Sequence, residues 1–104
     1  MNKTEMALAS FRKPYSCAQT VYAAFAEQID PQKMDEMKLN SAGRAPDGIC
    51  GALYAAISLR PECADEFKAK FSQLAGDTRC REIKTVHKTP CEECVKIAAS
   101  LLIL

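Results

Sequence analysis

The stretch that decides the fold is SCAQTVYAAFAEQI, residues 16–29. Its apolar side chains recur every four residues, so they share one stripe of an α-helix. These side chains belong to Cys17, Val21, Phe25 and Ile29. Because such a stripe has to be buried against other elements, we expect a helix over residues 16–29 that packs onto the core.

Two helices are expected after this stretch. Asp30 and Pro31 have the arrangement of an N-cap followed by a first-turn proline, which predicts a helix that runs to about Leu39. Residues 40–49, NSAGRAPDGI, have the composition of a loop. Residues 50–60, CGALYAAISLR, then repeat apolar side chains at helical spacing, and a proline follows them.

Two more helices complete the pattern, and no strand is predicted. Residues 61–76 open with proline and acidic residues and close on Gly76 as a C-cap. After a short turn at residues 80–83, Thr89 and Pro90 have the arrangement of a cap and first residue for the last helix. The side chains expected in the core of these helices are Met34, Met37, Leu53, Ala56, Ile57, Phe67, Phe71, Leu74, Val95, Ala98, Ala99 and Leu102.

The sequence therefore predicts an all-α protein, a single compact bundle of about five helices. Its 104 residues suit one domain, in which residues 1–15 form a short leading helix or arm. The N-terminal segment lacks the continuous apolar centre of a signal peptide. The apolar run at residues 98–104 is far shorter than the roughly 20 residues that span a bilayer, so we interpret it as the buried face of the last helix. We expect a cytoplasmic protein without membrane insertion.

The charge balance argues against nucleic acid as a partner. Lys and Arg number 14 and Asp and Glu 13, which leaves a formal net charge of +1. No basic stripe is present to attract a polyanion, and tryptophan, a common stacking platform, is absent. We therefore expect no binding to nucleic acid.

Six cysteines are the most informative feature of the composition. Clustered cysteines in a reducing compartment more often indicate metal ligation or redox chemistry than structural disulfides. Four of them fall at or just inside a predicted helix start, where the partial positive charge of the helix favours the thiolate. Because helix starts can meet at one end of a bundle, we expect these four to share a metal-binding or redox site. They are Cys17, Cys50, Cys80 and Cys91.

The neighbours of these cysteines add further candidates. Cys94 forms a CxxC pair with Cys91, one helical turn away, as in many metal and dithiol sites. Gly51 and Ala52 follow Cys50 and would let the backbone approach a cofactor closely, although they could equally serve a tightly packed helix start.

Two residues are simpler to explain without a role in the site. Cys63 lies in the first turn of a predicted helix and is most simply a small buried or surface thiol. His87 is close in sequence to two of the candidate cysteines, but a lone loop histidine is more often plain surface than a ligand.

Four segments together resemble a known family. SCAQTVYAAFAE, CGALYA, CRE at residues 80–82 and the terminal CEECVKIAASLL are similar to the C_GCAxxG_C_C family of redox-active proteins. The resemblance implies a helical domain with four key cysteines, which correspond here to the four at predicted helix starts. This chain departs from the family pattern at Ala55, where a glycine is usual, and by its additional Cys63 and Cys94. Cys94 is therefore a candidate to replace or supplement Cys91 as the working thiol.

Three functional hypotheses follow. The first is an electron-transfer module in which the four helix-start cysteines, with Cys94 as a further candidate ligand, bind an iron–sulfur cluster or zinc. The second is metal-free thiol–disulfide exchange by the same cysteines. Both need a redox partner protein that the sequence does not identify. The third is a structural or adaptor domain stapled by zinc or disulfides. No nucleophile elbow, phosphate loop or paired carboxylates indicate a hydrolase.

Overall fold

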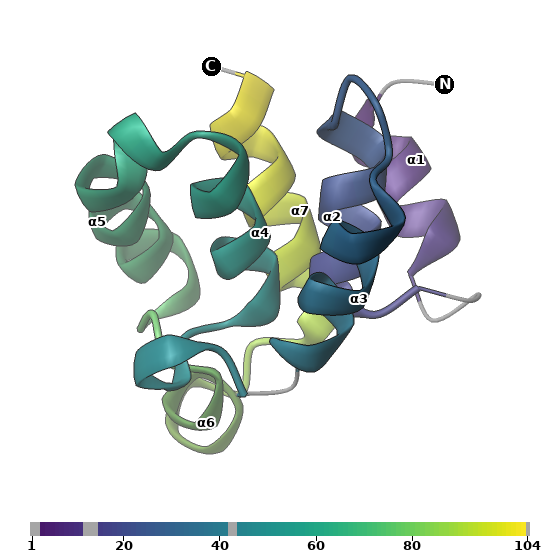
Figure 1. Cartoon of the computed structure of the whole chain (residues 1–104). Helices are drawn as coiled ribbons and strands as arrows, with labels where there is room; N and C mark the ends of the chain where they lie inside the picture. The colour runs from purple at the N-terminus through teal and green to yellow at the C-terminus, as the bar shows by residue number, and fades with distance from the viewer. Residues whose placement is uncertain (1–2, 12–14, 42–43, 104) are drawn as a thin grey trace.

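The computed structural model describes residues 3–11, 15–41 and 44–103. Within these ranges the chain is mostly helical and contains no strand, only two isolated β-bridges. The α-helices are α1 (Lys3–Ser10), α2 (Cys17–Phe25), α3 (Pro31–Leu39), α4 (Gly51–Leu59), α5 (Ala64–Ala75), α6 (Cys80–Glu82) and α7 (Cys91–Ile103) (Figure 1). The short turns η1 (Pro46–Gly48), η2 (Pro61–Cys63) and η3 (Ile83–His87) connect them.

The all-α prediction is confirmed, but the predicted number of about five helices is too low. The described residues contain seven α-helices, because the leading arm and the turn at Cys80 both take up helical geometry. The leading helix α1 is held by the Thr20 hydroxyl of α2, which donates to the carbonyl of the buried Ala7. This bond satisfies a hydroxyl that is itself buried, so it fixes α1 against α2.

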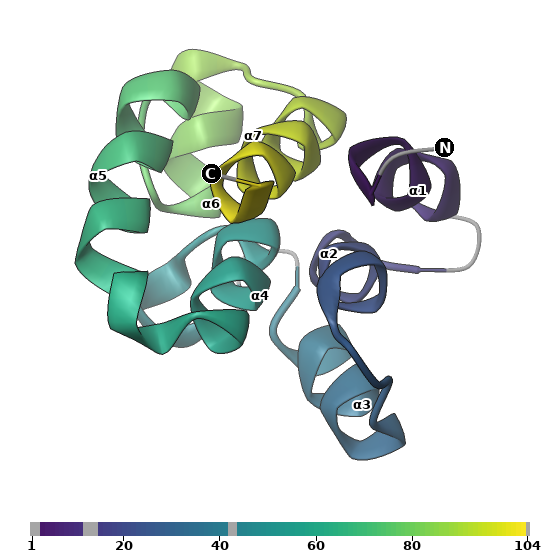
Figure 2. The same cartoon turned by 90° about the horizontal axis from the view of Figure 1, so that it is seen from above.

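The core is formed mainly where α2, α4, α5 and α7 face one another (Figure 2). Phe71 of α5, Leu53 of α4 and Val21 of α2 are completely buried there. The predicted face of α7 is confirmed, since its members are all buried: Val95, Ala98, Ala99 and Leu102. Burial of large apolar side chains is the main stabilising contribution to such a bundle.

For two residues the prediction of a place in the core is wrong. Ile29 is 52% exposed because α2 ends at Phe25, not at residue 29. The Tyr22 hydroxyl accepts a hydrogen bond from the Asp30 amide at 3.1 Å, and this contact accompanies the turn of the chain into α3. Leu74 is 61% exposed, since the buried row of α5 instead continues from Phe71 to Ala75, four residues on.

Several predicted helix ends are confirmed. Asp30 caps α3 by accepting from the Gln32 amide at 2.9 Å. Gly76 ends α5 in a left-handed conformation with a φ of 100°, as expected of a glycine C-cap. In the apolar run at residues 98–104, Ile103 is exposed and residue 104 lies outside the described ranges. None of the described helices is long and apolar enough to span a membrane.

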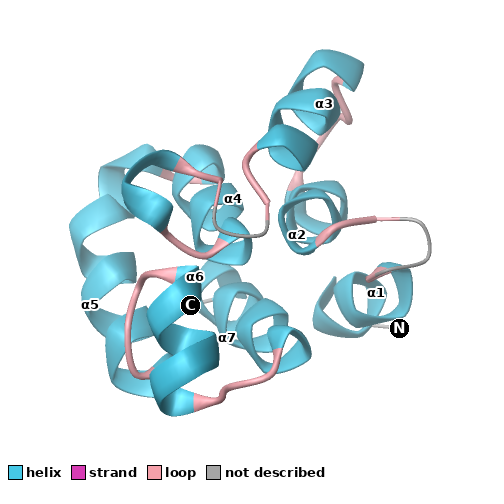
Figure 3. Cartoon of the chain, turned by 90° about the horizontal axis from the view of Figure 1, so that it is seen from below, coloured by secondary structure: helices cyan, strands magenta, loops and turns pink. Residues whose placement is uncertain are grey.

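The helices α2, α4 and α7 run in the same direction through the bundle (Figure 1). Their last residues, Phe25, Leu59 and Ile103, line a hollow of about 630 Å³ at one end of the molecule. Their first residues lie at the opposite end, where α6 lies between α5 and α7 in the view from below (Figure 3). The three helix starts therefore gather at one end of the protein.

Candidate functional site

Five of the six cysteines line a single small cavity at the end of the bundle where α2, α4 and α7 begin. The cavity has a volume of about 20 Å³ and an almost entirely apolar surface. Ile83 and Lys84 complete its lining. The cysteines are Cys17, Cys50, Cys80, Cys91 and Cys94.

Each helix-start cysteine has a definite place in its element. Cys17 and Cys91 are the first residues of α2 and α7, Cys80 is the first residue of α6, and Cys50 is the N-cap of α4. The structure thus brings together side chains that are as far apart in sequence as Cys17 and Cys94.

A short backbone contact joins the segments that carry Cys50 and Cys80. The Cys50 amide donates to the Thr78 carbonyl at 2.8 Å, and Ile49 forms an isolated antiparallel bridge with Arg79. These bonds hold the start of α4 beside the start of α6, so the two sulfurs reach the same cavity.

Cys17 is positioned by the capping of α2 and by the end of α3. The Ser16 hydroxyl accepts from the Gln19 amide at 3.2 Å, and the Gln19 side chain accepts from the Ser16 amide at 3.0 Å, which forms a capping box. The Ser41 hydroxyl, just after α3, donates to the Ser16 hydroxyl at 2.7 Å. These contacts fix the start of α2, and with it Cys17, against the end of α3.

Gly51 makes room for the Cys17 sulfur. A Cβ at position 51 would lie 2.7 Å from Cys17 Sγ and 3.1 Å from Ser41 Cα. Both Gly51 and Ala52 are buried. Because Gly51 has no side chain, the Cys17 sulfur and the backbone at Ser41 can approach it closely. A role of Gly51 and Ala52 in binding a cofactor stays a prediction.

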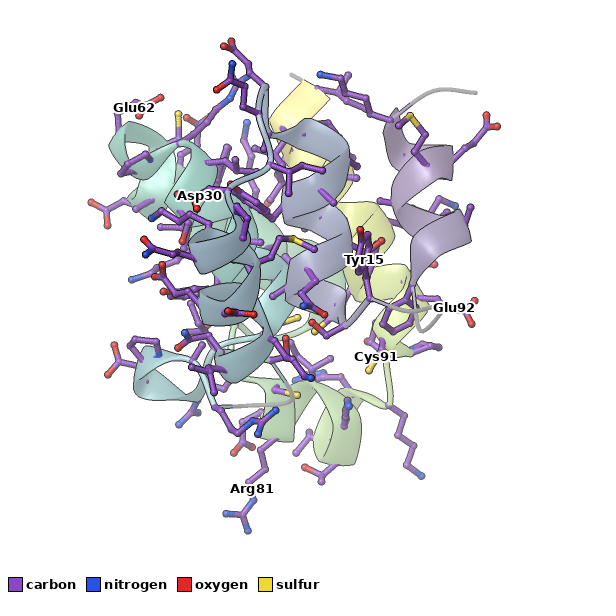
Figure 4. All side chains as sticks on the ribbon, turned by 45° about the vertical axis from the view of Figure 1, so that its right-hand side comes forward. Tyr15, Asp30, Glu62, Arg81, Cys91 and Glu92 are labelled. Atoms are coloured by element: carbon purple, nitrogen blue, oxygen red, sulfur yellow. The ribbon has the colours of Figure 1, made fainter. Side chains whose placement is uncertain are left out.

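The five thiols differ in their access to solvent. Cys50 and Cys94 are only 5% and 3% exposed, and both line the cavity. Cys17, Cys80 and Cys91 are half-buried. Figure 4 shows Cys91 at the start of α7, at the same end of the molecule as Arg81, whose side chain points away from the ribbon. The site thus has an inner pair of thiols and an outer set of three.

The helix starts do not dominate the electrostatics of Cys50 and Cys80. The hydrogen bond with Cys94 and then burial raise the pKa of the Cys50 thiol well above its ordinary value. The amides of Ala52 and Leu53 at the start of α4 act in the opposite direction but are outweighed. Burial likewise raises the pKa of Cys80. The expectation that helix starts favour the thiolate is therefore wrong for both residues.

Lys84 introduces a positive charge into the lining of the cavity. A side-chain hydrogen bond with Cys91 raises the pKa of Lys84, and the neighbouring Cys80 and Cys17 add to this shift. Lys84 is not among the site residues predicted from the sequence, although a signal was present: it follows Cys80 by four residues, which is about one helical turn.

The arrangement does not fit a metal centre as it stands. Thiols are suitable donors for zinc and for iron–sulfur clusters. In the described part of the chain, however, no three or more His, Cys, Asp or Glu side chains are placed to hold one metal ion. The volume of about 20 Å³ suits an occupant the size of one water molecule, so a cluster of several atoms would require the sulfurs to move apart.

Cys63 and His87 lie outside the cavity. Cys63 is half-buried between η2 and α5, where it packs against the core. The exposed His87 lies over Gly76, because a Cβ at Gly76 would overlap the imidazole ring. For both residues, packing accounts for the position without a role in the site.

No protein-family model matches this chain, and no curated protein or solved structure matches it either. The resemblance to the C_GCAxxG_C_C family therefore stays a prediction.

Proposed function

We propose that the protein is a redox-active thiol protein that exchanges disulfides with a partner protein through its cavity cysteines. The observation that carries this proposal is the burial of the Cys50 and Cys94 thiols at one small cavity, which three further cysteines also line. Thiols that line one cavity of about 20 Å³ can form a disulfide after an adjustment of their side chains.

The reaction is a two-electron exchange. A disulfide of the partner is reduced to two thiols, and the Cys50 and Cys94 thiols are oxidised to one disulfide, with their two protons passing to the released sulfurs through solvent. The reverse reaction reduces this protein and oxidises the partner. No other co-reactant is required.

The test is a redox titration with mixtures of reduced and oxidised glutathione. The protein is equilibrated in each mixture, quenched with acid, alkylated and mapped by mass spectrometry. We expect one reversible two-electron transition within roughly −320 to −180 mV, assigned to Cys50 and Cys94. Cys63 lies outside the cavity and serves as an internal control that stays open to alkylation.

Two variants sharpen this titration. Cys94→Ser should abolish the transition, whereas the matched variant Cys63→Ser should leave it unchanged. If all six thiols of the wild-type protein remain reduced across the whole range, the proposal is wrong.

A metal centre for electron transfer is the second candidate, and the gathering of five sulfurs around one cavity favours it. Cys17, Cys50, Cys80 and Cys91 would hold an iron–sulfur cluster or zinc, with Cys94 as a further donor, after a rearrangement of their side chains. A bound cluster would supply one-electron chemistry. Anaerobic purification followed by metal analysis and a visible spectrum tests this candidate, and colourless, metal-free protein with intact thiols would remove it.

If zinc had a purely structural role, its removal would affect the stability of the fold. A structural zinc ion contributes on the order of 10 kcal/mol or more to a small domain, so chelation should then unfold the protein cooperatively. If the helical content survives chelation and reduction, a stapling role for zinc or disulfides is excluded.

A further inference from the structure

The inner pair of thiols is shielded from any disulfide that arrives from outside. Cys50 is 5% exposed and Cys94 is 3% exposed. In thiol–disulfide exchange the attacking sulfur has to reach one sulfur of the disulfide directly, so access limits the rate. The cavity between the thiols, at about 20 Å³, is too small to admit a peptide disulfide. An outer cysteine is therefore needed to make the first contact.

Cys91 is the outer cysteine best placed to pass a disulfide inward. Cys91 and Cys94 are three residues apart on α7, so their side chains lie on neighbouring positions of one helix face. Cys94 and Cys50 are both buried and line the same cavity. Transfer from Cys91 to Cys94 needs no movement of one helix against another.

The other two outer cysteines are less suited to this transfer. The Cys17 sulfur is packed so closely against Gly51 that a single added Cβ would meet it at 2.7 Å. Cys80 belongs to α6, a helix of three residues, and not to the element that carries Cys94. A transfer from either one has to cross between elements.

We propose that Cys91 is the first-attacking thiol and that it relays oxidation to the buried Cys50–Cys94 pair. This inference rests on the proposed function and adds an order of events to it. All three cysteines line one cavity, where Cys91 is half-buried and Cys94 and Cys50 are buried.

Each step exchanges one disulfide for another. Cys91 attacks the partner's disulfide, forms a mixed disulfide and releases the first partner thiol. Cys94 attacks the Cys91 sulfur, which forms the Cys91–Cys94 disulfide and releases the second partner thiol. Cys50 then attacks the Cys94 sulfur, which leaves the Cys50–Cys94 disulfide and returns Cys91 to the thiol form. The proton of each attacking thiol goes to solvent, and each released sulfur takes one up.

The experiment mixes fully reduced full-length protein with oxidised glutathione, quenches with acid at increasing times and maps the adducts by mass spectrometry. In the wild-type protein, a glutathione adduct on Cys91 should precede the Cys50–Cys94 disulfide. Cys91→Ser should slow formation of that disulfide by on the order of tenfold or more, since only slower routes remain. Cys63→Ser, a matched variant of a half-buried thiol outside the cavity, should leave the rate within about twofold.

A further variant traps the relay at its middle step. In Cys50→Ser the final exchange cannot occur, so oxidation should stop at the Cys91–Cys94 disulfide. If Cys50→Ser does not fold, the order in which adducts appear in the wild-type protein tests the relay by itself. A first adduct on Cys17 or Cys80, or an unchanged rate in Cys91→Ser, overturns the relay while the exchange function stands. Absence of any disulfide in the wild-type protein overturns the exchange function as well.

Discussion

Replacing Gly51 with alanine tests how far the site depends on a missing side chain. The added Cβ would lie 2.7 Å from Cys17 Sγ, 3.1 Å from Ser41 Cα and 3.2 Å from the Asn40 carbonyl oxygen. The first distance is shorter than two such atoms tolerate, so the sulfur has to move. The other two are tight contacts with backbone atoms, which have to give way by a few tenths of an ångström.

The expected cost follows from two opposing effects. Overpacking of a buried site usually costs about 1–3 kcal/mol. Alanine is favoured over glycine by up to about 1 kcal/mol in a helix interior, but less at the first position of α4. We therefore expect Gly51→Ala to lower the free energy of unfolding by about 1–2 kcal/mol, which in a domain of this size lowers Tm by roughly 5–10 °C. Thermal unfolding followed by far-UV circular dichroism under reducing conditions measures this shift.

A double-mutant cycle assigns the cost to the sulfur contact. Cys17→Ala removes the sulfur, so in combination with Gly51→Ala it should recover about 1 kcal/mol relative to additive effects. Gly48→Ala is the control, since a Cβ there meets nothing within 4 Å and only the positive φ of 71° is strained. It should show no coupling to Cys17. A Gly51→Ala protein as stable as the wild type, with no coupling to Cys17→Ala, would refute the reasoning.

Three further predictions concern stability. Phe71→Ala should lower the free energy of unfolding in urea by about 3–5 kcal/mol because Phe71 is completely buried, and a loss below about 1 kcal/mol would contradict its place in the core. Ser16→Ala should cost about 1 kcal/mol in the same assay through loss of the α2 cap, while an unchanged urea midpoint would show that the cap contributes nothing. The folded-state pKa values of Cys50 and Cys80 are raised above the ordinary 9.0, so their stabilising effect is complete below about pH 9 and is lost as the pH rises through the folded values. Urea midpoints should fall above about pH 9, less so in Cys50→Ala, and a flat profile would contradict the assignment.

The helices could be predicted from the sequence because their caps and apolar rows are local signals. Asp30 with Pro31 and the closing Gly76 mark ends that the structure confirms. The end of α2 could not be predicted, because the apolar spacing continues to Ile29 while the bond between Tyr22 and Asp30 belongs to the tertiary structure. Local periodicity predicts where a helix can form, but tertiary contacts determine the residue at which it ends.

The candidate site could be predicted from the sequence only in part. Its cysteines could be placed at helix starts from local caps, but their common cavity depends on α2, α4 and α7 running in parallel and on the bond between Cys50 and Thr78. The missed Lys84 lies in a π-helical turn, η3, which the sequence pattern did not indicate. The direction of the Cys50 pKa depends on burial and on Cys94, and neither can be obtained from the position of Cys50 alone.

The opposing effects on the pKa of Cys50 suggest how the proposed exchange would be controlled. A helix start carries roughly half a positive charge, and the amides of Ala52 and Leu53 accordingly lower the pKa of the Cys50 thiol. The interaction with Cys94 and the burial of the site outweigh them and raise the pKa of the Cys50 thiol. Protonated, shielded thiols react slowly with small oxidants. In the proposed exchange, the inner pair would be oxidised only when a neighbouring sulfur delivers a disulfide to it, so the outer cysteines would determine which partners the protein accepts.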